Sequence, residues 1–539
     1  MNLSGLLPFV RQVPNYQQLV GAIERDEIDA LLGAGGGQGL GVISAARPYL
    51  TASLQRQLGL PLLVLTTRPE QVSQWAEQLR IWTGLSSVGV EGLSSVGVEG
   101  LSSVGVEGLS SVGVEGLSSV GAQNAGGVYP FPEPDALPYE RVPWSRETVS
   151  DRLAALAAFL RPQVAFDAAE GGVAPIVVAS ARSFMHYTTP LREFRVGMRH
   201  YRVGQEIDLQ RTLQGWVAHG YRPDTVVEEP GTFSRRGGLI DVYPPNLLRP
   251  VRIELFGDEI DSLRIFDPTT QRTVRQIDEF VLAPATEALP RLAERVSRRV
   301  AELDLTYCHG PSRTEYRRDL VHLEQGSFFR GIAFYLPFFY THPGALLDYL
   351  PTGGLCVVDD WEGLRAAIVD LDSQAAALQA DLVKAGELPA GFPRPYFTWD
   401  DVCDRLQASR SILLGGRMHE GRPALLSDLF SHGEGYGGQL KRVLDGFQEM
   451  RAAQDRVVVV SRQARRIADL LEERHTISVP REQVVEPPAP GSLTLVPGTL
   501  AEGWVMQSPV LRSHEAGVVR LLTDAEVFGW AKPAARRTR

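Results

Sequence analysis

The apolar positions of the first 180 residues alternate between two spacings. Some segments repeat an apolar residue every three or four positions, as helices do, and others are short unbroken apolar runs, as buried strands are. The helical segments are 16–28, 43–58, 70–83 and 150–160, the last with Ser150 as its N-cap, and the apolar runs are 29–32, 61–66, 128–131 and 175–179. Because strands that alternate with helices form parallel sheets covered on both faces, residues 1–180 predict the first half of an α/β scaffold.

Between about residues 181 and 286 the spacing changes to a period of two, which predicts a β-rich domain. The expected strands are 232–243, 251–256 and 260–266, with Gly237-Gly238 inside the first and a turn at Gly257-Asp258 between the other two. Alternating strands on either side of a two-residue turn predict a β-hairpin.

Helices and buried strands return after this domain. Residues 287–398 predict the second half of the scaffold, in which an apolar strand at 355–358 ends in Asp359-Asp360. A further small α/β domain is expected at 399–526, from strands 411–414 and 456–460 and helices 439–453 and 463–474, followed by a linker tail at 527–539. The expected fold class is therefore α/β: a helicase-like parallel-sheet scaffold with a degenerate P-loop, an inserted β-rich domain and a small α/β domain.

An octapeptide repeat interrupts the first half of the scaffold. The sequence LSSVGVEG begins at Leu85 and recurs three more times, and a decaying fifth copy completes the tract 85–124. Solenoid repeats normally vary from copy to copy and end in capping units. Identical, glycine-rich copies instead favour a recently expanded surface loop.

Composition and charge limit the classes of function. A net charge of −10 argues against a protein that binds nucleic acid over its whole surface. The three cysteines lie far apart, no apolar stretch is long enough to span a membrane, and the N-terminus does not resemble a signal peptide. We therefore expect a cytoplasmic protein without membrane contact.

The glycine-rich run 33–41 lies where a phosphate-binding loop would lie. In the best register, Gly36 and Gly41 take the two glycine positions, but Val42 and Ile43 take the positions of the phosphate-binding Lys and the metal-binding Ser/Thr. The chain contains only three lysines, at 384, 441 and 532, so none in this region replaces the missing cation. We expect no ATP hydrolysis, no cofactor, no catalytic residue and no metal site, with weak nucleotide binding through backbone amides as the alternative.

Arg235 and Arg236 form the most distinctive charge pair, and Arg222 is a possible companion. On a strand, the two adjacent side chains face opposite sides, and the glycines that follow would allow a bulge that re-aims them. The planar guanidinium group binds carboxylates with two hydrogen bonds, so a protein-binding site is one hypothesis and a solvated charged face is the other.

The segment around these arginines reads GTFSRRGGLIDVYPP and continues as PVRIELFGDEIDSLRIFDPTTQRT. It closely resembles the transcription-repair coupling factors (the Mfd family) and, more distantly, the excision-repair protein UvrB. Further stretches of the chain, LPYERVPWSRETVSDRLAAL, GIAFYLPFFYTHPGALLDYLP and LLTDAEVFGWAKPAARR, extend the resemblance. It implies a UvrB-like module whose β-rich domain docks UvrA through Arg222, Phe233, Arg235 and Arg236.

The resemblance also implies a function: recruitment of UvrA during nucleotide-excision repair, without ATP hydrolysis by this chain. The alternatives are a UvrB-like ATP-dependent helicase or translocase, and a non-functional remnant. The expected partners are UvrA, weakly DNA, and RNA polymerase only through family parts that lie beyond this sequence. UvrB's tyrosine-rich DNA-clamping hairpin would fall between Tyr139 and Ser150, a stretch with only two aromatic residues.

Overall fold

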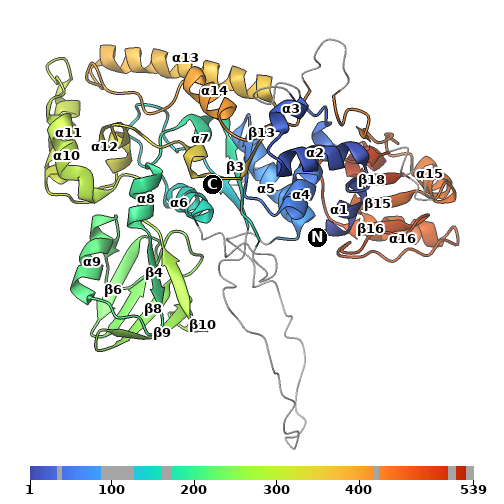
Figure 1. Ribbon diagram of the computed structural model, residues 1–539, viewed down its shortest axis with the longest axis horizontal. Helices are drawn as coiled ribbons and strands as arrows, with labels where there is room; N and C mark the ends of the chain where they lie inside the picture. The colour runs from blue at the N-terminus through green and yellow to red at the C-terminus, as the bar shows by residue number, and fades with distance from the viewer. Residues whose placement is uncertain (33–38, 86–126, 161–172, 417–423, 508–517, 530–539) are drawn as a thin grey trace, which may run out of the picture.

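The computed structural model describes the chain except for residues 33–38, 86–126, 161–172, 417–423, 508–517 and 530–539 (Figure 1). The predicted repeat loop, apart from Leu85, and Gly36 lie outside the described residues.

A five-stranded parallel sheet forms the centre of the scaffold, with the strand order β13-β12-β1-β3-β2. Its strands are β1 (Leu62–Thr66), β2 (Val128–Phe131), β3 (Ile176–Ser180), β12 (Leu355–Val358) and β13 (Ser411–Leu413). Strands from both sides of the β-rich unit in sequence, β1 and β12, therefore pair in one sheet. Unbroken apolar strands fit this arrangement because both faces of a parallel sheet are covered.

Helices cover the two faces of this sheet. Alternate strand residues, such as Leu62 and Leu63, belong to two different apolar cores. The first face is covered by α1 (Leu7–Val10), α2 (Pro14–Glu24), α4 (Arg47–Leu58) and α5 (Pro69–Thr83), and the second by α6 (Arg146–Phe159), α7 (Ala181–Met185), α13 (Trp361–Ala385) and α14 (Trp399–Gln407).

Two local predictions in this scaffold are wrong. Residues expected to form a strand at 29–32 belong to a helix, α3 (Ile28–Leu32), because a four-residue apolar run does not distinguish the two structures. The helix predicted at 150–160 begins earlier, at Arg146, and its N-cap is Ser145, whose Oγ accepts a hydrogen bond from the Thr148 N–H at 3.1 Å. Ser150 lies one turn inside the helix.

The β-rich unit contains a six-stranded sheet, ordered β10-β9-β8-β7-β6-β5, and a separate two-stranded pair, β4 with β11. Its elements are α8 (Leu191–Gly197), β4 (Arg199–Arg202), α9 (Leu209–Ala218), β5 (Arg222–Pro223), β6 (Thr232–Arg236), β7 (Leu239–Val242), β8 (Val251–Phe256), β9 (Glu259–Phe266), β10 (Thr273–Ile277) and β11 (Glu279–Leu282). The predicted hairpin of β8 and β9 is confirmed. Gly237 and Gly238 close a second two-residue hairpin, between β6 and β7, rather than forming the bulge that the sequence suggested.

The remaining elements complete the scaffold and form a C-terminal unit. Helices α10 (Ala293–Ala301), α11 (Gly310–Glu324) and α12 (Leu336–Phe339) follow the β-rich unit. The C-terminal sheet has the order β14-β17-β18-β15-β16. Its elements are β14 (Phe430–Ser431), α15 (Leu440–Ala452), β15 (Arg456–Ser461), α16 (Ala464–Glu472), β16 (Leu493–Pro497), β17 (Trp504–Met506), β18 (Val519–Thr523) and α18 (Asp524–Phe528).

One strand lies in a different sheet from the one expected. The strand predicted at 411–414, assigned to the small α/β domain, is β13 and pairs in parallel with β12 of the scaffold. Residues 40–42 run along its other edge, where the N–H groups of Leu40 and Val42 donate to the carbonyls of Leu413 and Leu414 at 2.8 and 2.9 Å. Spacing alone does not reveal which of two sheets an apolar strand joins.

An aromatic cluster joins the scaffold to the C-terminal unit. The ring of Tyr49 on α4 lies 4.6 Å from Trp504 on β17 and 5.1 Å from Trp82 on α5, and Phe430 packs against the same group. The C-terminal unit therefore packs on the scaffold, opposite the β-rich unit (Figure 1).

Candidate partner-binding site

Arg235 and Arg236 occupy the last two positions of β6, next to the turn at Gly237. Both side chains are exposed, and as neighbours on a strand they point to opposite faces of the sheet. The Arg235 Nε donates to the Gly237 carbonyl at 3.2 Å, and the Arg236 Nη2 donates to the Thr225 carbonyl at 2.9 Å. Within the described part of the chain neither forms an ion pair, so most of their donors are available to an external carboxylate.

Arg222 lies on the neighbouring strand β5, beside the other end of β6. It pairs with Thr232, four positions before Arg236, which corresponds to about 13 Å along a strand. Its guanidinium carbon lies 5.4 Å from the ring centroid of Phe328, a scaffold residue between α11 and α12, and its Nη2 lies 3.9 Å from the Glu229 carboxylate. The structure therefore separates Arg222, which touches the scaffold, from the pair at the free end of β6.

Phe233 lies in the core of the β-rich unit. Only 6% of its surface is exposed, and its ring packs edge-on against Trp216 at 5.6 Å. A direct contact between Phe233 and a partner would require this core to open. Its position instead holds β6, and hence the arginine pair, against helix α9.

Two other arginines of the same sheet, Arg252 and Arg264, are neutralised internally. Arg252 binds the Asp241 carboxylate through two hydrogen bonds of 2.7 and 2.9 Å, and these bonds raise the pKa of the Arg252 guanidinium. Arg264 binds Glu254 at 2.7 Å. These pairs depend on cross-strand register, because Asp241 stands opposite Arg252, and residue type alone does not reveal them. Arg252 and Arg264 thus stabilise the sheet through internal ion pairs, which Arg235 and Arg236 lack among the described residues.

A helix, α3, and not a strand precedes the glycine-rich run, of which the structure describes only residues 39–41. Gly41 has a φ of 74°, and the Val42 side chain, at the position of the phosphate-binding lysine, is 2% exposed in the core. Ile43 is half-buried and also packs against this core. The Arg47 Nε donates to the Val42 carbonyl at 2.9 Å, and its Nη1 lies 2.8 Å from the Asp359 carboxylate.

The two carboxylates after β12 both have internal partners. Asp359 is paired with Arg47, and Asp360 caps helix α13 by accepting a hydrogen bond from the Gly363 N–H at 3.1 Å. This engagement leaves neither group as a free carboxylate at the strand end. Among the residues that the structure describes, no cluster of three or more His, Cys, Asp or Glu side chains could hold a metal ion.

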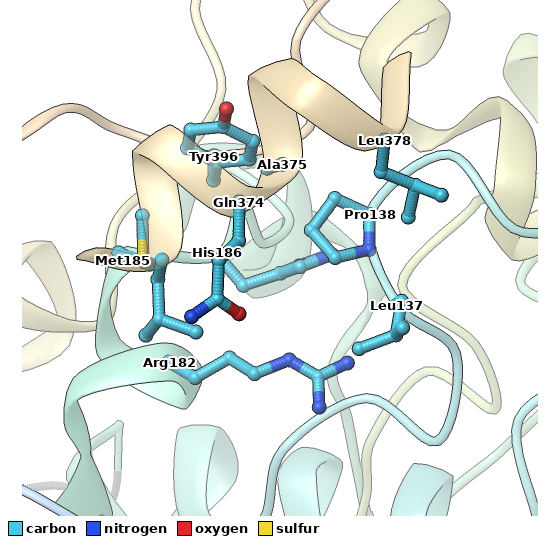
Figure 2. Close-up of a pocket in the computed structure, with 10 residues that line it drawn as sticks. Leu137, Pro138, Arg182, Met185, His186, Gln374, Ala375, Leu378 and Tyr396 are labelled. Carbon is cyan, nitrogen blue, oxygen red and sulfur yellow. The ribbon is translucent and has the colours of Figure 1, made fainter. Parts of the chain in front are cut away.

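An apolar cavity of about 230 Å³ lies on the other face of the sheet, between α7, α13 and the loop at Leu137 (Figure 2). Figure 2 shows Arg182 stretched across one side of it. The guanidinium group of Arg182 binds the Glu133 carboxylate at 3.3 Å and the Ala136 carbonyl. Burial, together with the nearby positive charge of Arg152, lowers the pKa of His186 to about 3, so its imidazole is neutral. The cavity therefore presents no free cation to a phosphate group.

The stretch between Tyr139 and Ser150, where a UvrB-type clamping hairpin would fall, contains no strand. It forms a loop followed by the first turn of α6, and Tyr139 is buried with its ring 6.3 Å from Phe392. In the described segments, no helix is both long and apolar enough to cross a membrane.

Comparison with known proteins finds a family model that matches the β-rich unit. Residues 200–287 match the model of the UvrB interaction domain, a range that contains Arg222, Arg235 and Arg236. Over 437 residues the chain is 30% identical to a transcription-repair-coupling factor of Myxococcus xanthus, with 75% of this chain and 34% of the relative covered. The chain is related to the transcription-repair-coupling factors. This confirms the resemblance inferred from the sequence.

Other relatives give the same family. A transcription-repair-coupling factor of Bacillus subtilis is 29% identical over 255 residues, which cover 45% of this chain and 22% of the relative. One from Staphylococcus epidermidis is 26% identical over 408 residues, which cover 72% and 33%. The chain thus spans about a third or less of the length of these curated relatives.

Proposed function

We propose that this chain recruits UvrA in transcription-coupled nucleotide-excision repair, and that the β-rich unit is the docking module. One observation carries the proposal. The unit that matches the UvrB interaction domain also holds Arg235 and Arg236 at an exposed strand end, without an internal carboxylate partner among the described residues. Because no internal carboxylate competes for these guanidinium groups, they are available to bind carboxylates of a partner.

The surroundings of the pair favour binding because they hold it in place. Strand β6 is bonded to β7 on one side and to β5 on the other, and Phe233 fixes its inner face against Trp216. The turn at Gly237-Gly238 is only two residues long. A site on a rigid strand loses less conformational entropy on association than a site on a long loop.

The scaffold, in this proposal, supports the docking module and does not hydrolyse ATP. Phosphoryl transfer needs a cation and a metal-bound hydroxyl or carboxylate near the phosphates. Here the lysine position holds the buried Val42, and the carboxylate at the end of β12 is neutralised by Arg47. Weak contact with DNA, and contact with RNA polymerase through further parts of such a protein, stay predictions.

Isothermal titration calorimetry with purified UvrA tests this proposal. The double variant Arg235→Ala/Arg236→Ala should lose about 2 kcal/mol of binding free energy, the scale of an interface hot spot and roughly a 30-fold rise in Kd. Arg272→Ala is the matched control, because Arg272 is an exposed arginine just before β10, at the far edge of the same sheet. Equal affinity of the double variant and the wild-type chain for UvrA would contradict the assignment of Arg235 and Arg236 to the UvrA interface.

A further inference from the structure

Two hairpin turns of the β-rich unit lie at the same end of the sheet. The pairs Arg236–Leu239 and Phe256–Glu259 close two-residue turns between β6 and β7 and between β8 and β9. A hydrogen bond of 2.9 Å from the Leu255 N–H to the Gly238 carbonyl joins them. We call this surface the hairpin end, and it consists of residues 235–238 and 256–259.

Phe256 is the apolar group of the hairpin end. Its side chain is 83% exposed, whereas Phe266, at the opposite end of β9, is fully buried. Side chains alternate along β8, so Phe256 lies on the same, less buried side of the strand as Arg252 and Glu254. An exposed phenyl ring is a large apolar group, and its burial against another surface would stabilise a complex.

Charges of opposite sign flank this ring. Arg235 and Arg236 lie on the β6 side, and Asp258 and Glu259 follow on the β9 side. All four side chains are exposed, and none of the four takes part in an ion pair within the described residues. Neighbouring strands are about 4.8 Å apart, so β6 and β8 are separated by about 10 Å and one partner surface can touch both.

We propose that Phe256 is the apolar anchor of the UvrA interface, and that the flanking charges fix the orientation of UvrA on it. The proposal rests on the proposed function. The surface of UvrA that fits the hairpin end has an apolar hollow for the phenyl ring, a carboxylate facing Arg236, which shares the face of Phe256, and basic groups facing Asp258 and Glu259. A second carboxylate would reach Arg235, which points to the other face, around the end of the hairpin. An aromatic side chain beside arginines is the usual composition of an interface hot spot. Charges of opposite sign on its two sides permit one docking direction and disfavour the reverse.

The test measures UvrA affinity of the full chain by calorimetry for Phe256→Ala, Val274→Ala and Arg235→Ala/Arg236→Ala. Val274 is the matched control, because it is 51% exposed on β10, at the far edge of the same sheet. Phe256→Ala should raise Kd at least tenfold with an unchanged melting temperature, and Val274→Ala should leave Kd within about twofold of the wild type. Phe256→Leu, which keeps apolar bulk, should recover part of the loss.

The affinities of the two variants distinguish a wrong assignment of Phe256 from a wrong proposal of UvrA docking. Wild-type affinity of Phe256→Ala, with weak binding by the arginine double variant, would overturn the anchor and leave the docking function in place. Wild-type affinity of both variants would overturn both. The orientation is tested by Asp258→Lys/Glu259→Lys, which should raise Kd and change its dependence on salt. Unchanged affinity of that variant at low and high salt would overturn the orientation.

Discussion

The guanidinium group of Arg47 lies 2.8 Å from the carboxylate of Asp359 and joins helix α4 to the carboxyl end of β12. The side chains are 17% and 8% exposed, so the pair is largely shielded from water. Arg47 also donates to the carbonyl of Val42, and thereby ties the segment after the glycine-rich run to the same point. In a nucleotide-binding protein, a carboxylate at this strand end would face a metal ion. In this chain, the carboxylate of Asp359 faces the guanidinium group of Arg47 instead.

Removal of Asp359 should destabilise the scaffold. Asp359→Ala leaves Arg47 in a shielded position without its partner, which typically costs about 3 kcal/mol of unfolding free energy. Urea unfolding followed by circular dichroism measures this cost. Asp360→Ala is the matched control and should cost about 1 kcal/mol, because it removes only the cap of α13. A midpoint of Asp359→Ala equal to that of the wild type would contradict a stabilising role for the pair.

Magnesium ATP should neither be hydrolysed nor stabilise the chain. The buried Val42 supplies no cation at the lysine position, and Asp359 is already paired, so the charge of the phosphates would remain unneutralised. A phosphate-release assay with and without DNA, together with melting curves with and without nucleotide, measures both effects. Release above the protein-free rate, or a rise in melting temperature with nucleotide, would show that a nucleotide site survives.

A second buried pair joins the scaffold halves. The side chains of Arg152 on α6 and Glu287, after β11, are 0% and 4% exposed, and two hydrogen bonds of 2.5 and 3.2 Å connect them. Glu287→Ala should cost about 3–5 kcal/mol, because it leaves a buried guanidinium unpaired. The double change Arg152→Met/Glu287→Leu should recover most of the loss, since neither charge remains.

An exposed pair provides the control for that experiment. Arg298 and Glu294 on α10 are both 75% exposed, and Glu294→Ala should leave the urea midpoint almost unchanged. If Glu287→Ala and Glu294→Ala shifted the midpoint equally, burial would not be the source of the stabilisation at Glu287.

Much of this fold was predictable because its strands are unbroken apolar runs or alternate strictly. The first pattern predicts the strands at 61–66, 128–131 and 355–358, which correspond to β1, β2 and β12, and the second predicts the hairpin of β8 and β9. The helix at 28–32 and the sheet to which β13 belongs were not predictable, because a short apolar run carries no information on its pairing partner.

The candidate site was predictable only in part. Residue type identified Arg235 and Arg236, but cross-strand register decides which arginines have internal carboxylates, as the pairing of Asp241 with Arg252 shows. The ring of Phe233 is buried because it packs against Trp216, and this packing keeps it away from the surface. Exposure of Phe256 follows from the alternation along β8, which places Phe256 on the same side as Arg252 and Glu254.

His186 should make the stability of the scaffold depend on pH. Its ring packs edge-on against Trp144 at 5.5 Å, and burial, with the charge of Arg152, lowers its pKa from 6.5 to about 3. Below pH 6.5 the unfolded chain binds a proton on this imidazole and the folded chain does not. The stability that the neutral ring contributes is therefore fully present above pH 6.5 and is lost as the pH falls toward 3.

The variant His186→Gln should remove this part of the pH dependence. For one proton the loss is at most about 1.4 kcal/mol per pH unit, so urea midpoints of the wild type should fall more steeply than those of the variant from pH 6.5 to about pH 4.5. His432→Gln, at an exposed position, is the matched control and should follow the wild type. If His186→Gln and the wild type lost stability in parallel across this range, the acid sensitivity would arise from other groups, and the imidazole at 186 would not be held neutral by its surroundings.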